Sequence, residues 1–195
     1  MTPKRFNKFS HVISKRQKFL TLVLENIHDQ HNVSAIFRSA EAAGIDKIYL
    51  IYNTNKFPKI GKTSSASAKK WITTEKFESV KDCFEELKKN KFRIYSTHMN
   101  EEKKKNLNLY DLDLTKKVAI VIGNEHTGVS DEVKEMSDKN FLIPMFGLIQ
   151  SLNVSVAAAV CVYEALRQRL AKGMYERSGY TKAELKEKLT DYLNR

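Results

Sequence analysis

Residues 143–160, Ile143-Pro-Met-Phe-Gly-Leu-Ile-Gln-Ser-Leu-Asn-Val-Ser-Val-Ala-Ala-Ala-Val160, decide how this 195-residue chain is expected to fold. They continue an apolar strand at 140–143, pass a turn that contains one proline and one glycine, and enter a helix rich in small residues. Ser151 or Asn153 can cap this helix, because their side chains accept hydrogen bonds from the unpaired N–H groups of its first turn. A strand end that runs into a small-residue helix is where open α/β sheets bind ligands, although a tightly packed core helix has the same composition.

The composition is that of one globular domain with a core of ordinary size. Hydrophobic residues make up 42% and charged residues 29% of the chain, and no apolar run approaches the roughly 18 residues of a membrane span. Cys83 and Cys161 lack the spacing of metal ligands, so we expect reduced thiols and a cytoplasmic protein.

The positive charge, formally +11, is concentrated in part at the start of the chain. Residues 1–20 carry six basic side chains and no acid: Lys4, Arg5, Lys8, Lys15, Arg16 and Lys18. Such a segment suits a polyanion, because each cation that neutralises a phosphate releases counterions. Apolar residues recur at helical spacing between Phe6 and Phe19, which favours a folded helix over a disordered tail. We therefore expect nucleic acid as the partner ahead of an anionic membrane.

Apolar runs alternate with amphipathic segments along the whole chain. We expect strands at 20–26, 47–52, 72–77, 92–99, 118–123 and 140–143. We expect helices at 33–43, at 79–90, from Ser130, after Asn153 and from Thr181, with Asn32 as the first cap and a charged connection at 101–115. Strands that are apolar on both faces and alternate with helices predict an α/β fold with a mostly parallel sheet and flanking helices.

Polar residues follow the strands at their carboxyl ends. They occupy 26–31, 97–99, 123–128 and 145–153. In a parallel sheet these ends meet at one edge, and we expect the functional site there. A separate group of lysines beside Ser and Thr is a candidate surface for phosphate contacts: Lys59, Lys62, Lys69 and Lys70.

Several chemistries do not fit the sequence. It has no G-x-x-x-x-G-K-[ST] phosphate loop, no G-x-G dinucleotide fingerprint and no G-x-S-x-G nucleophile elbow. The five histidines lack H-x-x-x-H spacing or a matching carboxylate cluster, so we expect no metal.

Three segments carry a family resemblance. The segment Asn26-Ile-His-Asp-Gln-His-Asn-Val-Ser-Ala-Ile-Phe-Arg-Ser-Ala-Glu-Ala-Ala-Gly44 resembles the first signature of the SpoU/TrmH branch of SPOUT RNA 2′-O-ribose methyltransferases. Residues 121–130 and 143–159 are similar to its second and third signatures, in the right order. Lys15-Arg16-Gln17 and Arg167-Gln-Arg169 also resemble the flanks of the members that modify tRNA. Gln30 departs from the family pattern, in which proline is frequent.

The resemblance implies a fold and a cofactor. The expected fold has a deep trefoil knot in the carboxy-terminal half, and the expected assembly is a homodimer with sites at its interface. It implies a basic helical extension at 1–19, a methyltransferase domain at 20–172 and a helical extension at 173–195. S-adenosylmethionine is the implied methyl donor, held against the backbone around Thr97, Gly123, Ile143, Met145 and Leu152.

The resemblance also implies the residues of the reaction. Arg38 is the predicted catalytic residue, with Asn32, Glu125, Ser151 and Asn153 ordering the site. Arg38 either acts as a base or binds a phosphate and stabilises the developing alkoxide, since a guanidinium rarely loses its proton. A structural ion pair of Arg38 with Glu41 or Glu125 is the alternative. The predicted RNA contacts are Arg5, Lys15, Arg16, His31, Arg167 and Arg169.

The function implied is 2′-O-methylation of a ribose in tRNA, specifically the guanosine at position 18 of the D-loop. Two alternatives stay open at this stage. One keeps the reaction on ribosomal RNA or on the tRNA wobble nucleotide, and the other is a family member that binds RNA without catalysis.

Overall fold

The protein is built around one sheet of parallel strands. The computed structural model describes residues 2–54, 56–58, 66–98 and 107–195. The strands are β1 (Leu20–Glu25), β2 (Lys47–Ile51), β3 (Thr73–Phe77), β4 (Arg93–Thr97), β5 (Leu107–Asn108), β6 (Val118–Ile122) and β7 (Lys139–Leu142). Their order is β3-β2-β1-β6-β4-β7-β5, and every neighbouring pair is parallel, which confirms the predicted sheet.

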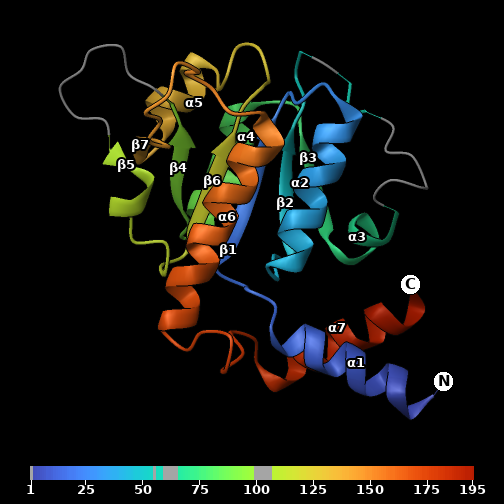
Figure 1. Ribbon diagram of the computed structural model, residues 1–195. Helices are drawn as coiled ribbons and strands as arrows, with labels where there is room; N and C mark the ends of the chain where they lie inside the picture. Colours follow the sequence, from blue (N-terminus) through green and yellow to red (C-terminus); the bar gives the residue numbers. More distant parts are fainter. Residues whose placement is uncertain (1, 55, 59–65, 99–106) are drawn as a thin grey trace.

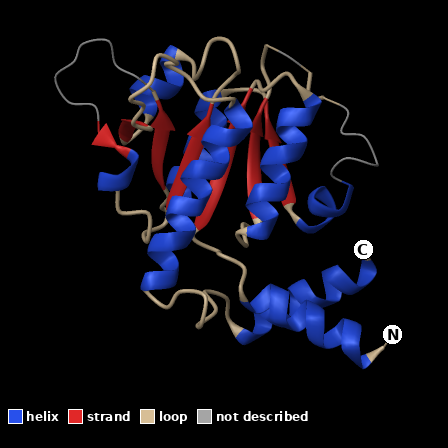
Figure 2. Cartoon of the chain, in the orientation of Figure 1, coloured by secondary structure: helices blue, strands red, loops and turns tan. Residues whose placement is uncertain are grey.

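Helices cover both faces of the sheet (Figures 1 and 2). They are α1 (Pro3–Ser14), α2 (Gln30–Ala42), α3 (Ala66–Trp71), α4 (Val80–Lys89), α5 (Asp131–Met136), α6 (Val154–Ala171) and α7 (Lys182–Asn194). Along β1, Leu20, Leu22 and Leu24 pack against α2 and α6, whereas Val23 points to the face covered by α4 and α5. This alternation follows from the two-residue period of a strand, and it directs Glu25 toward the α4 and α5 side.

Most expected boundaries differ from the observed ones by one to three residues, and two short elements were not expected. Helix α2 begins at Gln30 under the cap of Asp29, whose side chain accepts from the His31 N–H, so Asn32 lies inside the helix and is not its cap. Helix α3 and strand β5 were not expected, because a six-residue helix and a two-residue strand are too short to show a readable period. Among the predicted phosphate-contacting lysines, Lys69 and Lys70 lie exposed on α3, and Lys59 and Lys62 lie outside the described residues.

Helix α6 follows the decisive stretch of sequence. Asn153 caps it by accepting from the N–H groups of Ser155 and Val156, and Gly173 lies just beyond its end with φ of +64°. Only glycine adopts this left-handed conformation without strain. Within the ranges described, none of the helices is long and apolar enough to cross a lipid bilayer.

Helices α1 and α7 pack together beyond the amino-terminal ends of the strands (Figure 1). The rings of Phe9, Trp71 and Tyr192 form their common apolar centre, with centroid distances of 5.1–6.1 Å. The carboxy-terminal helix therefore docks on α1 of the same chain. The trefoil knot stays a prediction, with which the strand order is consistent.

Candidate active site

The loops after β1, β6 and β7 lie at one edge of the sheet, at the top of Figure 1, where β4 also ends. The parallel arrangement brings them together, because all of these strands end on the same side. The predicted polar edge is therefore present in the residues that the structure describes, with Met99 outside them.

A chain of hydrogen bonds joins three of these loops through side chains. Glu125, in the loop after β6, accepts from the Asn32 amide at 3.0 Å and from the backbone N–H groups of His28 and Asp29 at 3.0 and 3.1 Å. Asn32 in turn accepts from the Asn153 amide at 3.0 Å. Three of the predicted catalytic residues thus form one connected network at the starts of α2 and α6.

The network sets the charge of Glu125. Burial alone would raise the pKa of this carboxyl, but the hydrogen bonds from Asn32 and from the backbone of His28 and Asp29 lower it below its ordinary value. Glu125 is therefore ionised at neutral pH and acts as an acceptor that holds the loop after β1 in place.

A pocket of about 360 Å³ opens over this network and is called here the polar pocket. Its lining includes the network together with His126, Ser151 and Leu152. The structure thus places four of the five predicted catalytic residues around one space.

A second pocket, of about 250 Å³, adjoins the polar pocket and is called here the donor pocket. Thr97, Ile143, Met145 and Leu152 line it, so four of the five predicted cofactor residues are brought together. Among described residues, the backbone of 145–151 makes no hydrogen bond within the protein. Met145, Gln150 and Ser151 of this segment line the pocket, so their N–H and C=O groups are available to bind an adenine or a ribose. The pocket therefore fits S-adenosylmethionine.

Gly123, the fifth predicted cofactor residue, does not line the donor pocket. A Cβ atom at this position would lie 2.2 Å from the backbone of Gly128 and Val129. Glycine is thus needed here because the backbone at 128–129 passes too close to leave room for a side chain. Gly128 and Val129 line the donor pocket in its place.

Arg38 lies apart from both pockets. It is exposed on α2, and the described residues offer it no hydrogen bond or ion pair. Arg38 lies six positions after Asn32 on the helix, which moves it about 9 Å along the axis and turns it about 120° away. Glu41 pairs with Arg16 and Glu125 with Asn32, so the alternative of a structural ion pair for Arg38 is not present.

Two of the predicted RNA contacts are buried. Arg16 and Arg169 are 1% and 0% exposed, at the opposite end of the molecule from the pockets. Arg16 donates to Tyr192 Oη, to the backbone oxygens of Glu41 and Ile45 and to the Glu41 carboxylate. Neither guanidinium can reach an RNA in this conformation. The predicted RNA contact is therefore wrong for Arg16 and Arg169, and both residues have a structural role.

The other predicted RNA contacts are more accessible. Arg5 and His31 are exposed, and Arg167 is exposed while paired with Glu164 at 2.8 Å. Lys15 donates to the backbone oxygen of Tyr175 at 2.7 Å. Contact of these four residues with RNA stays a prediction.

Three residues that shape the site were not predicted from the sequence. Asp29 caps α2, and Asn124 donates to the backbone oxygen of Asn26 at 2.6 Å while accepting from the His126 N–H. An Asn two residues before a polar turn is a local signal that could have identified Asn124. Glu25 is 2% exposed at the end of β1, and its position within an apolar run gave no such signal.

The family model described as "SpoU rRNA Methylase family" matches residues 19–163. The chain belongs to the SpoU rRNA methylase family. The match spans both pockets and confirms the resemblance carried by the three sequence signatures, and it makes the protein a methyltransferase.

Two curated relatives of this SpoU protein cover nearly the whole chain. The tRNA (guanosine(18)-2′-O)-methyltransferase of Aquifex aeolicus is 38% identical over 184 residues, which are 94% of this chain and 86% of that protein. The enzyme of the same name from Thermus thermophilus is 37% identical over 194 residues, which are 100% of this chain and 98% of that protein.

A solved structure extends the comparison to three dimensions. The crystal structure of the A. aeolicus TrmH/SpoU tRNA modifying enzyme superimposes with a TM-score of 0.90 and 37% identity. It covers 98% of this chain and 95% of its own. The likeness thus includes α1 and α7, which lie outside the family match.

Proposed function

We propose that this protein methylates the ribose 2′-oxygen of guanosine 18 in the D-loop of tRNA, with S-adenosylmethionine as the methyl donor. The observation that carries the proposal is the junction of the two pockets, which share Ser151 and Leu152. A donor in one pocket and a ribose in the other meet at this junction. The names of the two relatives support tRNA and guanosine 18 as the substrate.

The donor pocket suits the cofactor through its backbone and its apolar lining. Thr97, Ile143, Met145 and Leu152 would surround S-adenosylmethionine, and the free backbone groups of 145–151 would bind its polar edges. When bound, the cofactor supplies an electrophilic methyl group. Gly123 remains a predicted contact whose first role is to let the chain pass closely.

The polar pocket would hold the ribose whose 2′-oxygen is the nucleophile. Glu125 fixes Asn32, and Asn32 fixes Asn153, so their remaining polar atoms and the Ser151 hydroxyl keep fixed positions around the ribose. The 2′-oxygen must lose its proton as it becomes a methyl ether. We assign to Arg38 the binding of the adjacent phosphate and the stabilisation of developing negative charge, because a guanidinium keeps its own positive charge at neutral pH.

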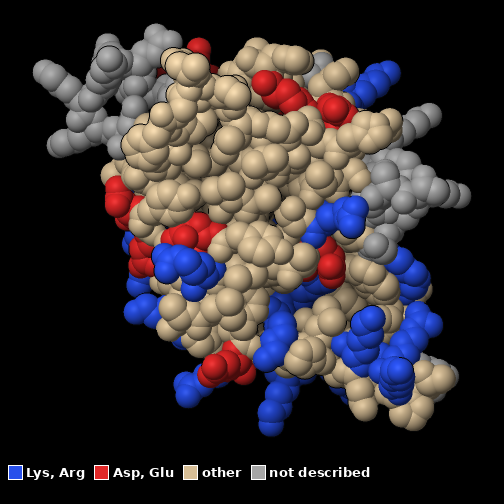
Figure 3. Space-filling model, viewed as in Figure 1, with Lys and Arg blue, Asp and Glu red and all other residues tan. Residues whose placement is uncertain are grey.

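A homodimer would complete this site. The exposed side of α6 carries Val156, Tyr163 and Leu170 at spacings of seven residues, and Phe146 and Leu148 are almost fully exposed beside it. Figure 3 shows that the surface over α6 carries few charges. Burying such a face against a second copy removes apolar surface from water. Arg38, which lines neither pocket of its own chain, would then act at the subunit interface.

The basic end of the molecule would hold the body of the tRNA. Lysine and arginine side chains gather near α1 and α7 in Figure 3. We propose Arg5, Lys15, His31 and Arg167 as RNA contacts.

We also propose that the chain divides into an extension at 1–19, a methyltransferase domain at 20–172 and an extension at 173–195. The compartment we propose is the cytoplasm, because Cys83 and Cys161 are buried and form no disulfide.

The deciding experiment is methyl transfer from labelled S-adenosylmethionine to unmodified tRNA, followed by mapping of the labelled nucleotide. Label on the ribose of guanosine 18 is the expected result. Label on the wobble nucleotide or on ribosomal RNA alone would keep the reaction and reject the substrate. Retention of RNA without binding of S-adenosylmethionine would identify a non-catalytic RNA-binding protein.

A further inference from the structure

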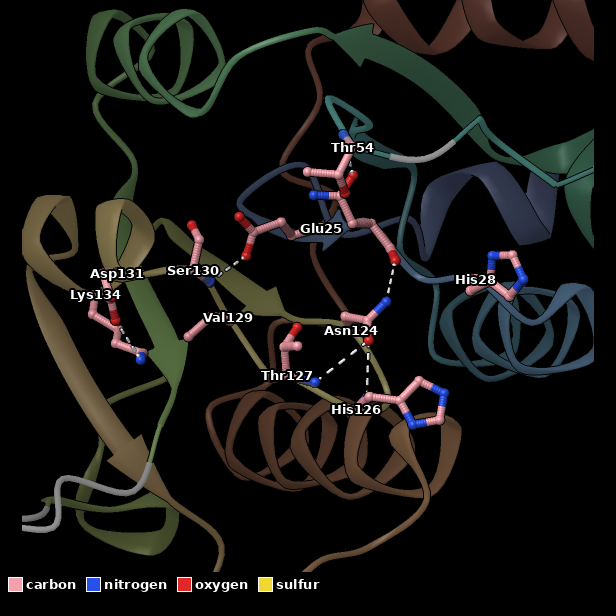
Figure 4. A pocket seen from close by; sticks show the side chains of 12 residues that line it. Glu25, His28, Thr54, Asn124, His126, Thr127, Val129, Ser130, Asp131 and Lys134 are labelled. Carbon is pink, nitrogen blue, oxygen red and sulfur yellow. Dashed lines mark hydrogen bonds and ion pairs between the residues drawn. The ribbon is translucent and has the colours of Figure 1, made fainter.

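A third pocket, of about 740 Å³, lies at the ends of β1 and β6 and is called here the Glu25 pocket (Figure 4). Its volume lies within the range of roughly 300–1,000 Å³ that is typical of ligand pockets. It shares His28 and His126 with the polar pocket, and Gly128 and Val129 with the donor pocket. A nucleotide can therefore reach from the Glu25 pocket to the junction where methyl transfer is proposed.

The pocket contains a buried acid with an unused oxygen. Glu25 Oε2 accepts from the Ser130 N–H at 2.9 Å, and Figure 4 shows the carboxylate directed at this side of the pocket. Oε1 is the one buried side-chain polar atom of the described residues that has no partner. Lys134, the cation of the pocket lining, is paired with Asp131 at 2.8 Å and is not bonded to Glu25. A buried carboxylate with one neutral donor is costly, so the site favours a ligand that brings further donors.

The backbone beside Glu25 is held in an uncommon conformation. Asn26 has φ of 50°, and its side chain bonds both the amide and the backbone of Asn53. Asn124 donates to its backbone oxygen. Conformations of this kind persist where the surroundings enforce them, and they are concentrated at functional sites.

We propose that the Glu25 pocket receives the base of the target guanosine and that Glu25 reads its Watson–Crick edge. This inference rests on the proposed function and names the residue that sets its base specificity. Guanine presents two adjacent donors, N1–H and the 2-amino group, whereas adenine presents an acceptor at N1. The two oxygens of a carboxylate only accept, so both can pair with guanine, whereas with adenine one oxygen accepts from the 6-amino group and the other faces the N1 acceptor unfavourably.

The binding step requires a small movement of Glu25. Oε1 is closed off from solvent in the free protein, so the carboxylate must rotate to expose Oε1 to the pocket as the base enters. The exposed rings of His28 and His126 stand at the mouth shared with the polar pocket, where a splayed RNA base can stack on imidazole (Figure 4).

The first test leaves the protein unchanged. The wild-type enzyme is given tRNA transcripts with guanosine, inosine or adenosine at the target nucleotide, and inosine lacks only the 2-amino group. We expect kcat/KM to fall about 10-fold with inosine and about 100-fold or more with adenosine, because sites built for hydrogen bonds reject analogues that lack them. No transfer to guanosine would reject the proposed function itself. Equal rates on guanosine and inosine would reject the Glu25 pocket alone.

The second test is Glu25→Gln. The amide oxygen still accepts from the Ser130 N–H, but the amide nitrogen presents a donor to the base. We expect the ratio of kcat/KM for guanosine over adenosine to fall by roughly 10- to 100-fold, with unchanged affinity for S-adenosylmethionine. An equal loss on all three transcripts would assign Glu25 a structural role and overturn the inference. If this variant does not fold, the inosine comparison decides.

Asp46→Asn is the matched control. Asp46 is also a buried acid, but it accepts from Tyr180 Oη and Lys188 at the α7 end of the molecule. Its substitution is expected to lower stability while the guanosine-to-adenosine ratio stays the same. A shift of that ratio as large as that of Glu25→Gln would show a general effect of destabilisation and overturn the inference.

Discussion

Arginine side chains behave in opposite ways at the two ends of the sheet. At the amino-terminal end, Arg16 and Arg169 are buried and bonded to several acceptors each. On α2, which starts at the carboxyl-terminal edge, Arg38 is exposed and has no partner among the described residues. Arginine thus stabilises the fold at one end, where it is buried, and is available to bind a ligand at the other end, where it is exposed.

Arg169 shows how a cation is stabilised without an acid. It donates to the backbone oxygens of Leu114, Phe19 and Lys116 at 2.7–3.0 Å and to the side chain of Gln17 at 3.1 Å. Burial lowers the pKa of Arg169 to about 10, which leaves it charged at neutral pH. It thereby ties α6 to the segment before β1 and to the segment before β6.

The largest expected effect is that of Arg169→Met. Removing the guanidinium leaves several buried oxygens without donors, so we expect the free energy of unfolding to fall by about 3–5 kcal/mol in a urea titration. Arg167→Met is the control, because Arg167 is exposed two residues earlier on α6 and its substitution should leave the urea midpoint nearly unchanged. A stable Arg169→Met protein with weakened tRNA binding would restore the RNA-contact role.

Arg38→Ala is the converse test at the other end. We expect kcat/KM for methyl transfer to fall by roughly 10²–10³-fold, the usual loss when one group that stabilises transition-state charge is removed. Stability should change by no more than about 0.5 kcal/mol, because the exposed side chain makes no bond among the described residues. Arg38→Lys keeps the positive charge but not the planar guanidinium, so it tests which of the two the reaction needs. Undiminished methyl transfer by a folded Arg38→Ala protein would contradict the catalytic role.

A smaller effect is expected for Glu125→Gln, and it depends on pH. The folded-state pKa of Glu125 is lowered, so its ionised form contributes stability above the ordinary value near 4.5 and loses it as pH falls through the folded-state value. At pH 7 the free energy of unfolding of the variant should be lower by about 1 kcal/mol. This loss is small for hydrogen bonds to a charged group, because solvent screens the partly exposed site. Thermal unfolding of both proteins from pH 7 down to pH 3 should show the difference shrinking, and a constant difference would argue against the ionised network.

The smallest effect is expected for Arg5→Ala. Arg5 is exposed on α1 and stacks over the Phe9 ring at 5.2 Å, so its loss should change stability by no more than about 0.5 kcal/mol. If Arg5 binds a phosphate, tRNA affinity should fall and the slope of log affinity against log salt should drop by about one. Filter binding at several salt concentrations measures the slope, and an unchanged slope would exclude the contact.

Local features of the fold were predictable because each is encoded within a few residues. The apolar runs gave the six longer strands, and the caps Ser79, Ser130, Asn153 and Thr181 marked four helix starts. The family signatures pointed to the residues of the polar and donor pockets, four of the five predicted in each case. The cap of α2 was misassigned by three residues, because Asp29 and Asn32 are both good caps and only the packed helix selects between them.

The sequence by itself determined the parallel α/β sheet, its polar edge and the family, since strand periodicity, caps and signatures are local. Only the tertiary structure decided which polar residues are free to act. Glu125 meets Asn32 across 93 residues of sequence, and Arg169 meets Gln17 across 152. Burial of a side chain depends on such distant neighbours, and burial separates the structural Arg169 from the exposed Arg38 and leaves Glu25 with an unused oxygen.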